Sequence, residues 1–230
     1  MKVVVTPPAF CKSENLKSKL SSIFPNTIYN EKGDYLSESE LIQFLKDTDA
    51  AIIGRDPVTK TTLDALPKLK MISKYGIGLD NLDIPSIKEK GVEFVVTAGT
   101  NKRSVAELTL SFMLGLCHRT FIGAERIKQG EWIREGGHDL SGKTVGIIGC
   151  GNVGKEVVHL LKLFGCVIMV CDIEDRSEFF RDQGITQSSF ESLAEKSDII
   201  TLHVPLTDLT RDMIDEAVLR EMQRASYLIN

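Results

Sequence analysis

The feature that most constrains the fold is a glycine pattern in the second half of the chain. Gly149, Gly151 and Gly154 form the spacing G-x-G-x-x-G. An apolar stretch over residues 145–148 comes directly before this pattern, and a stretch with helical periodicity over residues 152–164 follows it. A strand, a glycine turn and a helix in this order open a doubly wound α/β domain and indicate a dinucleotide site.

Each glycine has its own physical role in that interpretation. Gly149 permits a tight turn, Gly151 lets the backbone approach a pyrophosphate, and Gly154 lets the helix pack against the strand. The N-terminus of the helix then presents free amide groups to the anion. The alternative is a plain strand-to-helix turn, which the surrounding pattern disfavours.

A carboxylate follows the glycine pattern at the spacing expected for a ribose contact. Asp172 ends the next apolar stretch, 23 positions after Gly149, close to the offset of about 20 in dinucleotide-binding motifs. It would accept hydrogen bonds from the ribose hydroxyls and repel a 2′-phosphate, which favours NAD over NADP. Arg176 could accept such a phosphate by folding back over the ribose, but a solvated surface arginine is the preferred interpretation.

Composition excludes several other classes of protein. Hydrophobic residues make up 42% and charged residues 26% of the 230 positions, which argues against intrinsic disorder and coiled coil. The net charge of -4 gives no positive field for a polyanion, so a nucleic acid partner is not expected and a small ligand is.

Neither a membrane span nor a disulfide framework is expected. No run of 18 apolar residues occurs. The five cysteines include no C-x-x-C pair, so no zinc or other metal site is indicated either. This usage of cysteine predicts the reducing cytoplasm as the location.

Short apolar stretches alternate with helical segments along the chain, which predicts two α/β domains. The first, over residues 1–99, is the N-terminal part of a substrate domain, and the second, over residues 100–230, is a dinucleotide-binding domain. Expected strands cover residues 3–6, 50–54, 71–74, 93–97, 144–148, 167–171, 198–204 and 227–229. Expected helices cover residues 38–46, 62–66, 152–164, 190–195 and 216–222.

A long apolar helix follows the expected domain junction. Ser104 and Glu107 have the spacing of a capping box, and residues 108–116 are apolar on nearly every side of a helix. We therefore expect this helix to be buried between two bodies. Residues 121–140 contain four glycines and form a looser excursion.

Two further features leave alternatives open. Gly76 and Gly78 follow the strand over residues 71–74, where they either bring backbone amides to a ligand carboxylate or form a plain turn. Asn101 either caps or spaces the long helix or reaches into an interdomain cleft.

Four segments resemble the NAD-dependent D-2-hydroxyacid dehydrogenase family, nearest to its D-3-phosphoglycerate dehydrogenase branch. They are KYGIGLDNLD (74–83), NKRSVAELT (101–109), LSGKTVGIIGCGNVG (140–154) and DIITLHVPLTDLT (198–210). They follow the family's order over nearly the whole chain. The resemblance implies a flavodoxin-like substrate domain, a Rossmann-type NAD-binding domain, and a homodimer formed largely through residues 121–140.

The resemblance also implies roles for individual residues. It places the backbone of Ile77 and Gly78 at the substrate carboxylate and Asn101 beside the substrate. Arg55 is the best candidate for a substrate phosphate, with Lys74 and Arg103 behind it. The implied cofactor-binding residues are Gly149, Gly151, Asn152, Val153, Gly154, Asp172, His203, Val204, Pro205 and Thr210. Of these, His203 is expected to form a wall of the site rather than to act as an acid.

One part of the family's pattern has no match in these 230 residues. The family uses an arginine for the carboxylate and a histidine oriented by a glutamate for proton transfer, and all three follow the strand that corresponds to residues 227–230. We therefore expect no catalytic residue here, with Arg, Glu and His beyond Asn230. The expectation is an inactive first part of an enzyme that acts on a D-2-hydroxy acid, best 3-phosphoglycerate. The alternative is a non-catalytic NAD(H)-sensing or partner-binding protein of the same fold.

Overall fold

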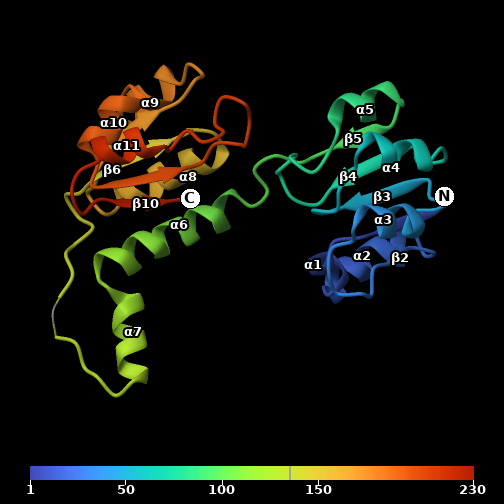
Figure 1. Cartoon of the computed structure of the whole chain (residues 1–230), viewed down its shortest axis with the longest axis horizontal. Coiled ribbons are helices and arrows are strands. Elements are labelled where there is room, and N and C mark those ends of the chain that lie inside the picture. Colours follow the sequence, from blue (N-terminus) through green and yellow to red (C-terminus); the bar gives the residue numbers. More distant parts are fainter. Residues whose placement is uncertain (135) are drawn as a thin grey trace. The chain divides into compact units, whose positions relative to one another are not determined.

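The computed structural model describes residues 1–134 and 136–230, and Figure 1 follows the chain through them. The chain divides into two compact units, Met1–Ala98 and Gly99–Asn230. The sequence-based boundary, between residues 99 and 100, lies one residue further along. Each unit is described by itself.

The first unit contains a five-stranded sheet in the order β2-β1-β3-β4-β5, with every pair parallel. This order is that of flavodoxin-like doubly wound folds. The strands are β1 (Val3–Val5), β2 (Ile28–Tyr29), β3 (Ala50–Ile53), β4 (Met71–Lys74) and β5 (Glu93–Val95). The helices are α1 (Pro8–Cys11), α2 (Glu14–Ile23), α3 (Glu38–Phe44), α4 (Lys60–Ala65) and α5 (Ile84–Glu89).

The core of this unit explains its short apolar strands. Val4, Ile53 and Ile72 are fully buried and pack with Leu41 of α3 and Ile87 of α5. Strands covered by helices in this way carry continuous apolar runs instead of an alternating pattern. The carboxyl ends of β3 and β4 lead into the loops that carry Arg55 and Gly76.

The second unit contains a five-stranded sheet in the order β10-β9-β6-β7-β8, again entirely parallel. Its strands are β6 (Thr144–Ile148), β7 (Val167–Cys171), β8 (Thr186–Gln187), β9 (Ile199–Leu202) and β10 (Tyr227–Ile229). The chain first moves to one side of β6 and then returns to the other, which is the Rossmann order for five strands. The α/β fold with doubly wound sheets is confirmed.

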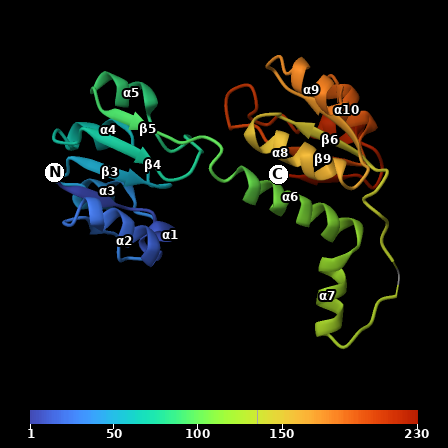
Figure 2. The ribbon, with the colours of Figure 1, turned by 180° about the vertical axis from the view of Figure 1, so that it is seen from behind.

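Helices cover both faces of this second sheet, as the two views in Figures 1 and 2 show. One apolar cluster joins β6 and β7 to α6 (Lys102–Cys117), α8 (Asn152–Lys162) and α9 (Ser177–Gln183). A second cluster joins the sheet to α10 (Phe190–Lys196) and α11 (Glu216–Glu221). The central strand β6 is therefore buried on both sides.

The predicted start of α6 is wrong. The helix begins at Lys102 with Asn101 as its N-cap, so Ser104 lies inside the first turn and forms no capping box. Within the second unit, α6 buries one face through residues such as Ala106 and Met113, while Leu108 is 54% exposed. Burial of the helix between two bodies stays a prediction.

Helix α7 (Thr120–Lys128) follows α6 after a sharp bend. Arg119 makes the bend in the left-handed conformation, with φ 54°. Within the described residues, no single helix is long and apolar enough to cross a bilayer; α6 and α7 together reach that length and composition but are bent by 67°.

Candidate functional site

The glycine turn lies at the point where the strand order of the second sheet reverses. Gly149 donates its backbone N–H to Cys171 O at the end of β7, 2.8 Å away. On the other side of β6, His203 donates its N–H to Ile148 O at 2.7 Å. The turn is therefore fixed between the carboxyl ends of β7 and β9, and in open α/β sheets ligands bind in the crevice at this position.

Two of the three glycines are required by close packing. A Cβ at Gly149, which has φ +91°, would lie 2.6 Å from His203 O, and a Cβ at Gly154 would lie 2.1 Å from Gly149 O. The helix thus approaches the strand as closely as backbone allows. By contrast, a Cβ at Gly151 would meet nothing within 4 Å, so the space beside this residue is open.

The first turn of α8 is suited to an anion. Gly151 is its N-cap and offers no side chain to the first amide groups. The N–H groups at Asn152 and Val153 belong to the set that a helix cannot satisfy internally. With open space beside Gly151, these amides can approach a pyrophosphate. The Asn152 side chain packs against Gly99, whose Cβ would lie 3.0 Å from Asn152 Cγ.

Asp172 is placed at the turn. Its Oδ2 accepts the backbone N–H of Cys150 at 2.5 Å, and its Oδ1 accepts that of Glu174 at 2.8 Å. The carboxylate therefore joins the glycine turn to the segment after β7. Asp172 directly follows β7, at the carboxyl edge of the sheet where the ribose of a dinucleotide would lie.

Arg176 is not the fully solvated side chain that the sequence favoured. Its side chain is 30% exposed and pairs with Glu174, and its Nε is buried without a hydrogen-bond partner among the described residues. The Arg176 charge also acts on the Cys150 thiol, which places it near the turn. Burial raises the pKa of that thiol to about 11, so Cys150 stays a neutral thiol.

His203 and the loop after it lie beside the glycine turn on the β9 side, opposite the end of β7. Burial lowers the pKa of His203 to about 4, so the imidazole is neutral at pH 7, and its Nε2 lies 3.0 Å from Thr201 Oγ1. Val204 Cγ1 lies 2.7 Å from where a Gly149 Cβ would be. Thr210 donates its hydroxyl to Pro205 O at 2.6 Å and accepts the Thr207 N–H at 2.8 Å. Thr210 thereby shapes the loop that starts at Pro205.

The first unit has a separate cavity of about 300 Å³ at the carboxyl ends of β3 and β4. Its lining includes two cationic side chains and two glycines: Arg55, Lys74, Tyr75, Gly76, Gly78, Asp80 and Asn81. The adjacent Ile77 is 40% exposed. Positive charge next to exposed backbone suits a carboxylate, although Asp80 offsets one of the two charges.

Lys74 anchors this cavity through contacts that the sequence did not reveal. Its Nζ donates to Gly54 O and, at 2.7 Å, to Asn81 Oδ1. Asn81 Nδ2 donates in turn to Asp56 O at 2.6 Å. Burial lowers the pKa of Lys74, and the charges of Asp80 and Asp56 oppose that shift. The motif containing Asn81 was visible in the sequence, but its partners Gly54 and Asp56 in the segment after β3 were not.

The remaining candidates are distributed as follows. Asn101 makes no side-chain cap, and its Oδ1 is buried without a partner among the described residues, which disfavours the capping alternative. Arg103 pairs with Glu107 at 2.6 Å and Glu156 at 3.0 Å, so its guanidinium is already engaged. Among the described residues, no histidine forms an ion pair with a carboxylate, and His138 instead lies 3.3 Å from Tyr227 OH.

Comparison with known proteins decides the family. Residues 110–230 match the D-isomer specific 2-hydroxyacid dehydrogenase, NAD binding domain. The chain belongs to this family. The match covers more than half of the chain and includes the glycine turn, Asp172 and His203. It also confirms NAD as the cofactor of the second unit.

The relatives have several substrates. The chain is 35% identical to a glyoxylate reductase of Thermofilum pendens, over 84% of this chain and 60% of that protein. It is 31% identical to a D-3-phosphoglycerate dehydrogenase of Methanocaldococcus jannaschii, over 100% of this chain and 43% of that one. A crystal structure of D-lactate dehydrogenase from Aquifex aeolicus with NAD and lactic acid superimposes with a TM-score of 0.85 at 26% identity, covering 100% of this chain and 68% of the other.

The chain spans about 60% of the length of the first curated relatives it matches. These comparisons support the resemblance inferred from the sequence, including the phosphoglycerate branch as one of several. They establish the family of NAD-dependent 2-hydroxyacid dehydrogenases but no single substrate.

Proposed function

We propose that this protein binds NAD at the glycine turn and serves an oxidoreductase reaction on the CH–OH group of a D-2-hydroxy acid. The observation that carries the proposal is the position of the turn. Gly149, Gly151 and the start of α8 lie at the reversal of strand order, with the Asp172 carboxylate bonded to the same turn.

The residues of the second unit fit the dinucleotide in distinct ways. The amides of Asn152 and Val153 bind the pyrophosphate, and Asp172 binds the ribose. His203, neutral and half-buried, forms a wall along the adenosine and nicotinamide side together with Val204, Pro205 and Thr210. NAD bound by these residues would supply the acceptor for a hydride from C2 of the hydroxy acid.

The cavity of the first unit fits the acid. The backbone at Ile77 and Gly78 binds the substrate carboxylate. Asn101 of the second unit is a further proposed substrate-binding residue, because its Oδ1 is buried and has no partner among the described residues. Arg55 lines the cavity and binds a second anionic group, for which 3-phosphoglycerate and 3-phosphohydroxypyruvate are the best substrate pair. Two observations support this pair: the Arg55 side chain is exposed, and one relative of the chain is a D-3-phosphoglycerate dehydrogenase.

Proton transfer is not assigned to any described residue. Oxidation of the CH–OH group releases a proton from the hydroxyl, and a general base must accept it. No described histidine is paired with a carboxylate in a way that suits this role. We propose that these 230 residues bind NAD and do not transfer hydride by themselves. The alternative is a non-catalytic NAD(H)-sensing or partner-binding protein of the same fold.

Titration with NADH, followed by coenzyme fluorescence, tests the binding proposal. The wild-type chain is compared with Asp172→Ala and with Asp182→Ala, which removes an equal but exposed charge from α9. We expect weaker binding only for Asp172→Ala. Equal affinity of all three proteins would remove Asp172 from its role.

An assay of NADH oxidation with 3-phosphohydroxypyruvate tests the catalytic part. We expect no turnover by the pure 230-residue chain, and robust turnover would contradict the assignment of no catalytic base. If the chain binds NADH and a partner protein responds to it without turnover, the sensing alternative is favoured.

We further propose a homodimer and a cytoplasmic location. Apolar side chains of α7 and the segment after it are exposed within the chain, including Phe121, Ile122, Ile127 and Trp132. A second copy would bury such a surface. The five cysteines are all free, which supports a reducing compartment.

A further inference from the structure

We propose that Tyr35 is a positioning residue for Arg55, and that the two together select hydroxy acids that carry a second anionic group. The inference rests on the proposed function, because Arg55 lines the cavity assigned there to the acid. Tyr35 lies outside every motif that the sequence singled out. Its contribution depends on a loop between β2 and α3 that packs against the end of β3.

The ring of Tyr35 lies close to Arg55 and to Gly54, the residue before it. The Arg55 Cζ is 5.8 Å from the centroid of the Tyr35 ring, within the range of a cation–π contact. Beneath the ring, a Cβ at Gly54 would lie 2.7 Å from Tyr35 Cε1. Only a glycine at position 54 lets the ring pack this closely against the end of β3.

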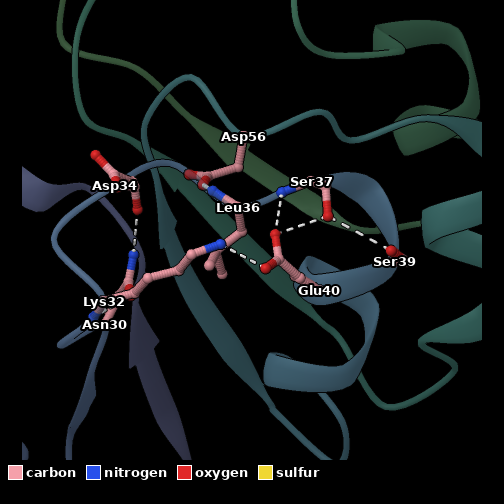
Figure 3. Close-up of polar contacts among 8 residues, drawn as sticks. All are labelled: Asn30, Lys32, Asp34, Leu36, Ser37, Ser39, Glu40 and Asp56. Carbon is pink, nitrogen blue, oxygen red and sulfur yellow. Dashed lines mark hydrogen bonds and ion pairs between the residues drawn. The ribbon is translucent and has the colours of Figure 1, made fainter.

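The loop that carries Tyr35 is fixed on both sides of that residue. Before it, Asn30 Nδ2 donates to Asp34 O at 2.8 Å. After it, Leu36 donates its N–H to Asp56 Oδ1 at 2.7 Å, and the Glu40 carboxylate accepts the Ser37 N–H at 2.9 Å. Figure 3 shows these contacts converging on residues 34–37. The backbone that carries the Tyr35 ring is therefore held in place on both sides, while Tyr35 itself is 40% exposed.

Asp56 is the buried hub of this arrangement. Its carboxylate is fully buried and accepts, besides Leu36 N–H, the hydroxyl of Thr6 at 2.5 Å. Although it follows Arg55 directly, its hydrogen bonds join the ends of β1 and β3 to the loop, and no ion pair with Arg55 is found among the described residues. The Asp56 carboxylate thus accepts hydrogen bonds from neutral donors. It does not form an ion pair with the Arg55 guanidinium among the described residues.

The two cationic side chains of the cavity differ in whether their N–H groups are already hydrogen-bonded within the chain. Lys74 already donates two of its three N–H groups to Gly54 and Asn81 and is buried. Arg55 is exposed, and none of its N–H donors is engaged by a hydrogen bond within the described part of the chain. Arg55 is therefore the group able to form a bidentate contact with a phosphate or carboxylate. Stacking on Tyr35 reduces the rotamer freedom that such a contact would otherwise remove.

The test compares two acids that differ only in the second anion, 3-phosphoglycerate and D-glycerate. Their affinities for the 230-residue chain are measured by calorimetry for wild type, Tyr35→Leu, Tyr35→Phe and Arg55→Leu. Tyr29→Leu is the matched control, because its ring faces Lys17 instead of Arg55. A parallel spectrum of the arginine Nε–H groups, with the Arg55 signal identified by its loss in Arg55→Leu, reports the ring contact without any ligand.

We expect Tyr35→Leu to weaken 3-phosphoglycerate binding by about two- to five-fold, the range of an exposed cation–π contact. Glycerate binding stays unchanged, Tyr35→Phe retains both affinities, and the Arg55 signal shifts in Tyr35→Leu only. In Tyr35→Leu/Arg55→Leu, the loss equals that of Arg55→Leu alone, because the two residues act as one unit.

The outcomes separate this inference from the function on which it rests. If wild type binds neither acid, the proposed substrate site is wrong and the selection by Tyr35 and Arg55 is wrong with it. If wild type binds 3-phosphoglycerate but Tyr35→Leu weakens both acids equally, or matches wild type, only the inference about Tyr35 is overturned. An Arg55 signal that does not shift in Tyr35→Leu overturns it as well.

Discussion

Replacing Gly154 by alanine tests whether close contact between α8 and the glycine turn maintains the site. A Cβ at this position would lie 2.1 Å from Gly149 O, whereas ordinary contact starts at 3.4 Å. The helix and the turn must therefore separate by about 1.3 Å, the difference between these two distances. Both contacting groups are backbone, so no side chain can rotate away.

The size of the effect follows from this clash. Overpacking typically costs about 1–3 kcal/mol, while alanine in a helix regains up to about 1 kcal/mol over glycine. We expect Gly154→Ala to lower the free energy of unfolding by about 2 kcal/mol. Because the amides of Asn152 and Val153 move with the helix, NADH binding should fall at least about ten-fold, the equivalent of one lost charged hydrogen bond.

Gly151→Ala is the matched variant. Its φ is −74° and its Cβ would meet nothing within 4 Å, so the free energy of unfolding should change by no more than about 0.5 kcal/mol. The methyl group would still occupy the open space proposed for the pyrophosphate and weaken NADH binding. Urea denaturation and NADH fluorescence measure the two effects. An unchanged urea midpoint for Gly154→Ala, or equal destabilisation by both variants, would refute the packing argument.

Three other predictions concern separate parts of the molecule. Asp172→Ala should weaken NADH binding by about ten-fold or more, since it removes a charged acceptor, and the fluorescence titration described above checks it against Asp182→Ala. Burial lowers the pKa of His203 in the folded state to about 4, whereas a free histidine titrates near 6.5. As the pH falls, the unfolded state therefore binds the proton first. The free energy of unfolding should decrease by about 2–3 kcal/mol between pH 6.5 and pH 4. Urea midpoints across this range should fall less steeply for His203→Gln than for wild type, and parallel curves would contradict the assignment. Ile127→Glu, at a side chain that is 65% exposed on α7, should leave the fold intact and shift the sedimentation coefficient from dimer to monomer; a monomeric wild type would exclude the proposed homodimer.

The sequence was most informative where structure depends on neighbouring residues. The strands Met71–Lys74, Thr144–Ile148 and Val167–Cys171 were predicted with their observed bounds, because each is a short apolar run between polar or glycine-containing segments. The glycine turn was equally clear, since its chemistry requires a strand before it and a helix after it. By contrast, helix α2 was not predicted: Leu16, Leu20 and Ile23 do recur at helical spacing, but polar residues separate them and none of the residues of α2 is fully buried.

The remaining features depend on contacts between distant segments. The start of α6 was misplaced because the spacing of Ser104 and Glu107 imitates a capping box, whereas the observed N-cap is Asn101, which makes no side-chain cap. The link from Lys74 to Gly54 and the packing of Tyr35 over Arg55 join loops 20 residues apart along the chain. A pattern of residue types contains no information about which loops meet, and the sheet order is needed to bring them together.

A crystal structure of the protein grown with NAD tests the central claim most directly. The account predicts electron density for the pyrophosphate against the amides of residues 151–153 and hydrogen bonds from the adenosine ribose to the Asp172 carboxylate. A dinucleotide bound elsewhere on the chain, or a glycine turn that stays empty at saturating NAD, would contradict it.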